Sequence, residues 1–309
     1  MADFSIHTLG CGSAKPTLRH RPSSTVVDFR NNLFMVDCGE GAQLAMMKAR
    51  LKFQRLSNIF LTHLHGDHVL GLPGLISTLD LHGEGGEITI HTFKEGEDIL
   101  RPILKAFAGY TSFDVKFNIL NPQGGEIAFE NHALTVETVK LTHRVPAIGY
   151  IFREKPKPHH LKRDMCDFHG VPMYMFNRIK GGEDFIKPDG TVIPNSILTS
   201  DPGAPLSYAH ISDTAFNPDI AEKIGPVDLL FHETTYLEKD LPLAAPRGHS
   251  TARQAAEIAR RAGAGWLLTG HYSSRYRDDE EFRREALEVF PNVILNREGL
   301  ITSIPELRK

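Results

Sequence analysis

Seven consecutive residues, THLHGDH (62–68), contain three histidines and one aspartate. Imidazole nitrogens and carboxylate oxygens are donors that zinc and related first-row metals prefer. The run that leads into them, LSNIFLTH, is apolar and then abruptly polar, which is typical of a buried strand that ends in a loop. So many donors directly after a buried strand favour a metal site over a polar surface loop that holds histidines by chance.

Four donors from one loop are more than a single open catalytic site takes, so we expect two neighbouring metal ions. His63 and His65 would bind one ion, and Asp67 and His68 the other. The small residue Gly66 is expected to let the chain turn so that both pairs face one pocket.

Further donors follow three later strand-like segments. VKLTHRVPAIGY carries His143, AHISDT carries Asp213, and WLLTGHYSSRY carries His271. A single histidine at a strand end is more often a hydrogen-bonded or exposed residue, but these three together supply what the first cluster lacks. Because a carboxylate can bridge two metals, we expect Asp213 to lie between them, with His143 completing the first site and His271 the second.

The pattern of the chain predicts the elements that position these donors. Alternating, strand-like runs lie at 4–14, 23–29, 31–41, 58–68, 87–93, 113–120, 126–143, 206–214, 227–236, 264–276 and 292–296. Helical patterns lie at 41–51, 72–83, 96–109, 251–263 and 278–290. Strands in blocks with helices between some of them favour an α/β fold of two sheets with helices outside, rather than a doubly wound parallel sheet.

The middle of the chain differs from the rest. Residues 153–196 are rich in proline, glycine and charge and show weak periodicity, so we expect a protruding insertion in a single domain that spans residues 1–309. The stretch REKPKPHHLKR at its start is strongly basic, and Lys155 and Lys157 could contact phosphates by charge alone. A solubilising loop is the alternative.

Composition limits the classes of function. The formal net charge is −3, so any nucleic acid must be bound by a local basic patch. The chain has three cysteines, Cys11, Cys38 and Cys166. Their number is odd, and their spacing matches neither a disulfide framework nor a zinc finger, which favours a reducing compartment. The first ten residues have no pattern of a secretory signal, and no run approaches the roughly 18 apolar residues of a membrane helix. We therefore expect a cytoplasmic protein with no membrane partner.

The ordered set of motifs resembles one family. THLHGDH resembles the zinc motif of the metallo-β-lactamase superfamily, and FMVDCGEGAQLAMM, HRVPAIGYIF, ISDT, HETTY, GHST and GHYSSRY are together similar to ribonuclease Z. Members of that family trim the 3′ end of precursor transfer RNA. The resemblance spans residues 4–300 and implies a four-layer αβ/βα sandwich, that is, two mixed sheets flanked by helices.

The resemblance also implies roles for individual residues. Two Zn²⁺ per subunit would be held by the ligands named above, with Asp67 accepting a proton from the attacking water. Asp37 in VDCGEG would not bind a metal itself but would contact a metal-binding residue and hold it in place. Glu233 and His249 would protonate the leaving oxygen. Ser273 and Arg275 would hold a phosphate, and the protein would be a homodimer.

Two segments depart from the family pattern. The glycine–proline pair typical of the family's RNA-gripping arm is missing near Val171–Pro172. In LRHRPSS, Pro22 stands where the family usually has asparagine. Both departures concern substrate recognition rather than the predicted ligands.

Two other functions fit the same scaffold. A hydrolase of small phosphodiesters or sulfate esters would keep the chemistry and change the substrate. A redox or binding protein would belong to another class, but diiron redox relatives usually replace part of the histidine cluster with glutamate, and the cluster here is intact. Zinc-dependent endonucleolytic processing of precursor transfer RNA, leaving a 3′ hydroxyl, is therefore the leading hypothesis.

Overall fold

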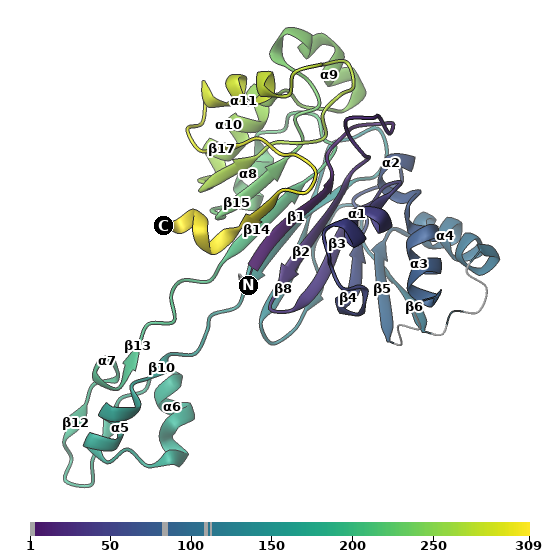
Figure 1. The fold of residues 1–309 in the computed structure, drawn as a ribbon. Coiled ribbons are helices and arrows are strands. Elements are labelled where there is room, and N and C mark those ends of the chain that lie inside the picture. Colours follow the sequence, from purple (N-terminus) through teal and green to yellow (C-terminus); the bar gives the residue numbers. More distant parts are fainter. Residues whose placement is uncertain (1–3, 82–85, 108–110, 112) are drawn as a thin grey trace. The chain divides into compact units, whose positions relative to one another are not determined.

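The computed structural model describes residues 4–81, 86–107, 111 and 113–309. The first of its two large sheets has seven strands (Figure 1). In spatial order they are β18 (Ile301–Ser303), β1 (Phe4–Gly10), β2 (Ser24–Phe29), β3 (Asn32–Cys38), β4 (Leu56–Phe60), β5 (Glu87–Thr92) and β6 (Asp114–Ile119). Neighbours from β18 to β3 pair antiparallel, whereas β3 to β6 pair parallel, so the sheet is mixed.

A two-residue turn makes the hairpin between β2 and β3. Arg30 and Asn31 both have positive φ, 44° and 67°, which is the conformation of a type I′ turn and matches the twist of the flanking strands. Asn32 already belongs to β3, where it pairs with Phe29.

The second large sheet also has seven strands and is mixed. In spatial order they are β17 (Val293–Ile294), β16 (Trp266–Leu268), β15 (Leu229–His232), β14 (Ser207–Ile211), β9 (Ile148–Glu154), β8 (Leu134–Lys140) and β7 (Gly124–Glu130). The strands from β17 to β14 pair parallel, and β14 pairs antiparallel with β9. The site residues of this half follow β8, β14, β15 and β16, whose ends meet at one edge of the sheets.

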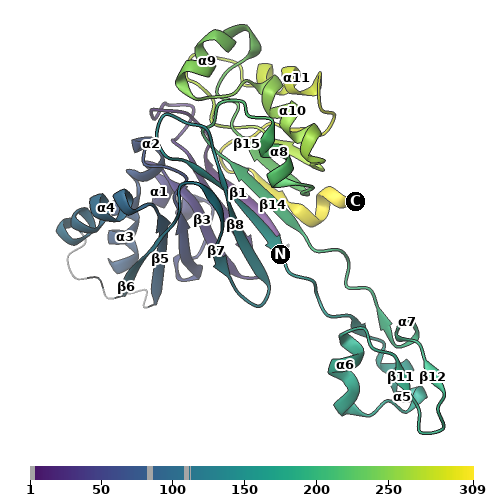
Figure 2. The same cartoon turned by 180° about the vertical axis from the view of Figure 1, so that it is seen from behind.

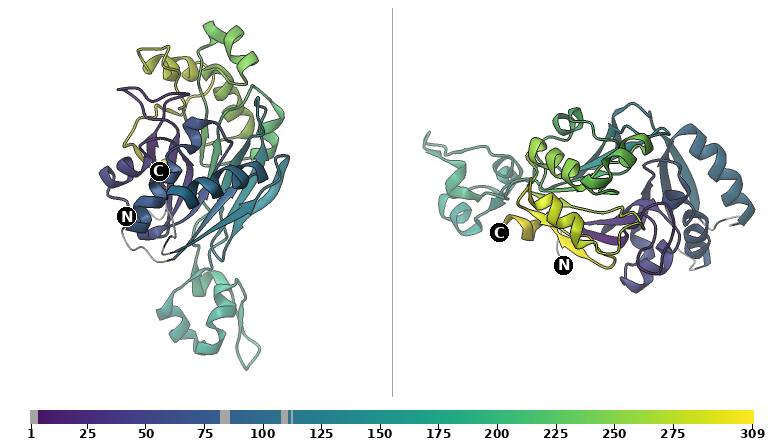
Figure 3. Two further views of the ribbon diagram at one scale, coloured as in Figure 1. Left: turned by 90° about the vertical axis from the view of Figure 1, so that its right-hand side faces the viewer. Right: turned by 90° about the horizontal axis from the view of Figure 1, so that it is seen from above.

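Helices cover the outer faces of both sheets (Figures 2 and 3). The first sheet carries α1 (Ala42–Lys48), α3 (Leu72–Leu81) and α4 (Lys94–Phe107), and the second carries α8 (Asp219–Ile224), α10 (Ala252–Ala262) and α11 (Glu280–Leu287). Outside residues 154–205, the remaining helices are η1 (Phe53–Arg55), α2 (Gly66–Val69), η3 (Glu238–Asp240), α9 (Leu241–Arg247) and η4 (Ile304–Arg308). The two-sheet prediction with helices outside is confirmed. The predicted helix ends at 82–83 and 108–109 lie outside the described residues.

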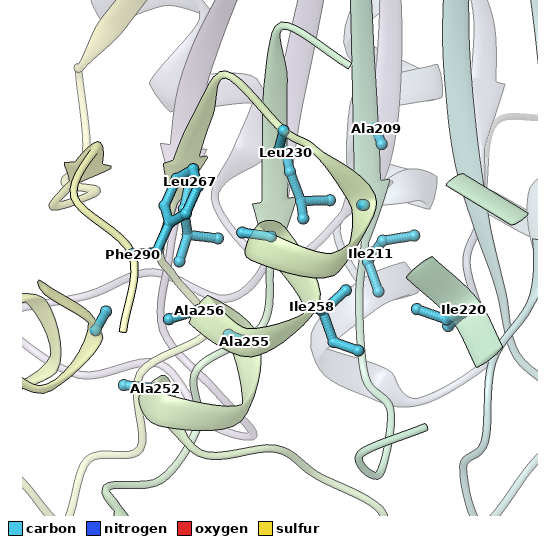
Figure 4. Packing of buried hydrophobic residues seen from close by; sticks show 14 of the residues in the cluster. Ala209, Ile211, Ile220, Leu230, Ala252, Ala255, Ala256, Ile258, Leu267 and Phe290 are labelled. Carbon is cyan, nitrogen blue, oxygen red and sulfur yellow. The ribbon is translucent and has the colours of Figure 1, made fainter. Parts of the chain in front are cut away.

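Apolar packing joins each sheet to its helices. Figure 4 shows Leu230 and Leu267 of the second sheet facing Ile258 and the alanines of α10. Small residues on this helix let it approach the sheet closely, and each fully buried leucine or isoleucine contributes about 1.5–3 kcal/mol. Thr251 and Gln254 form a capping box at the start of α10. This fixes the helix directly after GHST.

Aromatic side chains fill the space between the two sheets. Phe34 of β3 lies 5.2 Å from Phe129 of β7, and Phe60 of β4 lies 5.1 Å from Tyr150 of β9, measured between ring centroids. The buried Tyr150 hydroxyl donates to the carbonyl of Leu61 at 2.7 Å. These contacts hold the end of β4, and therefore the histidine-rich segment after it, against the second sheet.

Residues 131–134 and 154–205 form a second compact unit with its own elements. They include β10 (His160–Leu161), α5 (Arg163–His169), η2 (Met173–Met175), α6 (Phe176–Lys180), β11 (Phe185–Ile186), β12 (Val192–Ile193), α7 (Asn195–Leu198) and β13 (Thr199–Ser200). Its small core contains Cys166, Val171, Ile179, Phe185 and Leu198. The weak periodicity of this segment thus reflects short elements, and its description as an insertion in a single domain stays a prediction.

Candidate metal centre

Three histidines from two parts of the chain converge at the end of β4. His63 Nε2 lies 3.0 Å from His65 Nδ1, which lies 3.3 Å from His143 Nε2. Both His63 and His143 face the same carboxylate oxygen, Asp213 Oδ2, at 3.6 and 3.8 Å. His63 and His65 lie in the segment after β4, where His65 has an extended backbone, and His143 lies in the segment after β8.

A second cluster lies on the other side of Asp213. His68 Nε2 and His271 Nε2 are each 3.5 Å from Asp67 Oδ2. The same two nitrogens lie 3.5 and 3.2 Å from Asp213 Oδ1. Asp213 therefore turns one oxygen to each cluster, which is the arrangement of a bridging carboxylate.

The backbone that presents the second cluster differs in one respect from the sequence prediction. Gly66 is the first residue of α2, without positive φ, so Asp67 and His68 come from a helical turn rather than a loop that needs glycine. A Cβ at Gly66 would lie 2.9 Å from the flexible end of Leu70. His271, by contrast, has φ of 61°, a left-handed conformation that few non-glycine residues adopt and that clusters at functional sites.

The chemistry of this donor set fits a pair of divalent cations. The Nε2 atoms of His68 and His271 are buried and, over the residues that the structure describes, have no hydrogen-bond partner. A buried polar atom without a partner is costly, and a cation would satisfy both nitrogens. The two ligand sets are His63, His65, His143 with Asp213, and Asp67, His68, His271 with Asp213.

Asp37 lies behind the second cluster. It is fully buried, and its Oδ2 atom is 2.7 Å from His68 Nδ1, while Thr62 donates to both of its oxygens at 2.8 Å. Burial alone would lower the pKa of His68, but the carboxylates of Asp37 and Asp213 outweigh it and raise that pKa well above the usual value. A carboxylate on the far ring nitrogen orients a metal-binding histidine and increases its basicity.

Glu233 and His249 form a pair at the edge of the centre. Glu233 Oε1 lies 3.0 Å from His249 Nδ1 and accepts backbone N–H groups of Thr214 and Ser250, each at 3.1 Å. Burial lowers the pKa of His249, but the Glu233 carboxylate more than compensates and raises it to about 9. His249 Nδ1 is also 3.9 Å from Asp213 Oδ2, so this pair can hold a proton beside the two clusters.

Several residues that contact the predicted metal-binding side chains were not identified from the sequence. The N–H of Ala14 donates to Asp67 Oδ2 at 2.7 Å, and Thr235 Oγ1 lies 2.9 Å from His271 Nδ1. His143 Nδ1 donates to the carbonyl of Gly248 at 2.8 Å, and a Cβ on that glycine would come within 2.7 Å of the same nitrogen. The glycine in GHST is a usable signal for this close approach, whereas a backbone amide such as that of Ala14 has none.

The predicted substrate-binding residues come from both compact units. Ser273 follows His271 by two residues and lines a pocket of about 290 Å³, whereas Arg275 is exposed and is not among the lining residues. Lys155 and Lys157 belong to the second unit, where Lys157 Nζ pairs with the buried Glu154 carboxylate at 3.1 Å.

Comparison with known proteins decides the family. Over 304 residues, 98% of this chain and 100% of the relative, the sequence is 49% identical to a ribonuclease Z of Parabacteroides distasonis. The chain belongs to the ribonuclease Z family. A ribonuclease Z of Porphyromonas gingivalis is 45% identical over 300 residues, which are 97% of this chain and 99% of that relative.

Broader comparisons concern the fold and the superfamily. The fold is similar to that of the human tRNase Z, short form, with a TM-score of 0.70 and 23% identity over 97% of this chain and 99% of that one. Family models match parts of the chain: "Anti-Pycsar protein Apyc1" matches residues 4–155, and "Beta-lactamase superfamily domain" matches residues 197–272. The predicted family, fold and enzyme class, a metallo-β-lactamase-fold endoribonuclease, are confirmed. No described helix is long and apolar enough to cross a lipid bilayer.

Proposed function

We propose that this protein is a zinc-dependent phosphodiesterase that cuts precursor transfer RNA at its 3′ end and leaves a 3′ hydroxyl on the transfer RNA. The position of Asp213 supports the proposal, because each of its carboxylate oxygens faces a different cluster and one carboxylate can bridge two adjacent cations. Two Zn²⁺ per subunit would be held by His63, His65 and His143 on one side and by Asp67, His68 and His271 on the other. Membership of the ribonuclease Z family supports the substrate.

Zinc, when bound, lowers the pKa of a water to about 7 and stabilises the charge of an in-line phosphoryl displacement. The protein's own groups orient the metal-binding side chains and transfer the protons. Asp37 and Thr235 orient the histidines of the second cluster through their far nitrogens. Asp67 is proposed to accept the proton of the attacking water, and the Ala14 amide fixes the oxygen that faces the centre.

The leaving oxygen needs a proton, and His249 is proposed to donate it. Because Glu233 keeps the pKa of His249 near 9, the ring carries a proton at neutral pH. General acids of this kind typically contribute about 10²–10⁴-fold to the rate. Ser273 and Arg275 are proposed to contact phosphates of the RNA, Ser273 beside the centre and Arg275 at the surface.

The same proposal covers the binding partners of the protein and its cellular compartment. Lys155 and Lys157 in the second unit are proposed to contact the transfer RNA backbone, and the active form is proposed to be a homodimer. The three cysteines are buried and unpaired, which supports a reducing environment and hence the cytoplasm.

An assay of the zinc-loaded protein on two substrates tests the proposed function. A precursor transfer RNA with a 3′ trailer should be cut at one position, and the product should carry a 3′ hydroxyl. A small chromogenic phosphodiester should be a much poorer substrate by kcat/KM. Preference for the small ester, with the precursor left intact, would replace the RNA substrate by a small phosphodiester.

A further inference from the structure

Cys11, His20 and Glu298 bring three possible metal donors together in the larger compact unit, apart from the two clusters around Asp213. A thiol sulfur, a ring nitrogen and a carboxylate oxygen all lie within 4.8 Å of one another. Cys11 is 2% exposed, and the side chains of His20 and Glu298 are 14% and 17% exposed. The first two residues lie between β1 and β2 and the third between β17 and β18, so the fold alone brings them together.

The distance between the thiol and the imidazole suits a shared cation. Cys11 Sγ lies 3.5 Å from His20 Nδ1. For zinc bonds of about 2.3 Å to sulfur and about 2.0 Å to nitrogen in tetrahedral geometry, these two donors should lie about 3.5 Å apart. A hydrogen bond between thiol and imidazole has a similar length, so the contacts and charges around the donors have to distinguish the two arrangements.

The contacts of His20 and Glu298 are those expected of metal ligands. His20 Nε2, the ring nitrogen that does not face the thiol, lies 2.9 Å from Asp279 Oδ2, and a carboxylate is the usual partner of this nitrogen in a metal-binding histidine. The other oxygen of Asp279 accepts from the Arg19 guanidinium at 2.5 Å. Glu298 Oε1 accepts the backbone N–H of Arg21, whose guanidinium lies 3.4 Å from Oε2. Each donor is thus fixed by a further contact.

The charges of the cluster suit a divalent cation. Without a cation, burial and the nearby carboxylates of Glu298 and Asp279 raise the pKa of the Cys11 thiol, so the sulfur keeps its proton at neutral pH. A bound cation would displace this proton, because the thiolate is the form that binds metals. The negative charges of the thiolate and of Glu298 would then balance the two positive charges of the cation.

The donor types define the class of ion and its strength of binding. A thiolate beside an imidazole selects zinc and chemically similar ions over magnesium and calcium. Each cluster around Asp213 offers four donors, whereas this one offers three and must also lose a proton, so it should bind its ion more weakly. A cavity of about 490 Å³, lined in part by Arg21 and Glu298, gives the ion a route to the cluster.

We propose that Cys11, His20 and Glu298 form a third metal site, which binds one divalent cation of the zinc type at metal concentrations above those that fill the dinuclear centre. The cation would join the segment after β1 to the segment before β18. The Cys11 carbonyl accepts the backbone N–H of Tyr272 at 2.9 Å, so the cation would also stabilise the backbone next to His271. The site goes beyond the proposed cleavage of RNA and does not depend on it.

Titration of the metal-free protein with Co²⁺ tests this site. A thiolate bound to Co²⁺ gives a strong charge-transfer absorption in the near ultraviolet, whereas the imidazoles and carboxylates of the dinuclear centre give none. The wild type should bind three Co²⁺ per chain, and the absorption should rise with the last ion bound. Cys11→Ser keeps a hydrogen-bonding group beside His20 but removes the sulfur, so it should bind two ions and lack the absorption.

Two results would overturn the proposal: a wild type that binds two Co²⁺ per chain without the absorption, and the same absorption in Cys11→Ser. The first result would mean that the thiol and the imidazole are only hydrogen-bonded. A wild type that binds a single Co²⁺ per chain and shows the absorption would support this site and contradict the dinuclear centre. The titration therefore separates a failure of this site from a failure of the proposed function.

Two further variants complete the test. Cys166→Ser is the matched control, because Cys166 is also buried but lies in the second unit, where its thiol donates to the Leu198 carbonyl at 3.7 Å. It should keep the absorption and all three ions. His20→Gln replaces Cys11→Ser if that variant does not fold, and it should lose the absorption at Co²⁺ concentrations that saturate the wild type. An unchanged titration of His20→Gln would likewise overturn the proposal.

Discussion

The Nδ1 atom of His249 lies 3.0 Å from Oε1 of Glu233, and this contact sets the charge of the imidazole. Burial disfavours the charged ring, but the carboxylate outweighs burial and brings the pKa of His249 to about 9. Since the protonated form is proposed to donate to the leaving oxygen, kcat for precursor cleavage should fall as the pH rises through the pKa of His249. Glu233→Gln removes the negative charge, so it should lower the pKa of His249 and move this fall to lower pH. A falling limb at the same pH in both proteins would contradict the assigned role.

Removal of the proposed acid should slow the chemical step without emptying the metal centre. His249→Ala is expected to lower kcat by roughly 10²–10⁴-fold, the range for general acids, while the zinc content stays unchanged. Single-turnover cleavage and elemental analysis measure the two quantities. His132→Ala, an exposed histidine in the second unit, is the control and should behave as the wild type. Loss of zinc from His249→Ala would instead make this residue a ligand.

Asp37 should act on metal affinity through His68. Asp37→Asn keeps the size of the side chain at a position with φ of 57° and removes the charge that faces His68 Nδ1. Loss of such a partner typically lowers metal affinity about 10–100-fold. Zinc affinity measured by competition with a chelator should show this loss for one of the two ions. Unchanged affinity for both ions would mean that Thr62 and packing alone orient His68.

Substitutions of Lys155 and Lys157 should have different effects. Lys155→Ala is expected to weaken transfer RNA binding and to reduce the slope of log affinity against log salt by roughly 0.7–0.9, the value for one phosphate contact. Lys157→Ala should in addition lower thermal stability, because it removes a partner of the buried Glu154 carboxylate. An unchanged salt slope in both variants would assign the basic segment to solubility.

The convergence of the predicted metal-binding residues could be predicted from the sequence because several of them follow shortly after a strand, and strand ends converge at one edge of a sheet. His63, His143, Asp213 and His271 are such residues, and the structure brings them together as expected. The strand and helix patterns also predicted most elements of the larger unit, since alternation and helical periodicity follow burial on one face.

Other features could not be predicted, for identifiable physical reasons. The contact of Ala14 with Asp67 uses a backbone amide, which any residue type supplies. The helical turn at Asp67 and His68 is too short to show periodicity. The elements of the second unit are likewise short, with a core of few residues, so their pattern is weak. The Arg19–Asp279 pair joins residues 260 positions apart, a separation that a single sequence does not reveal.

The dinuclear account is tested most directly by measuring two quantities, the zinc stoichiometry and the rate of precursor cleavage. Both are measured in the wild type and in Asp213→Ala. The wild type should contain two zinc ions per chain and cut the precursor. Asp213→Ala should retain fewer ions and lose cleavage, and His65→Ala, which removes a ligand of one ion only, should do the same. Full activity in Asp213→Ala, or a fully active wild type with a single zinc ion per chain, would contradict the account.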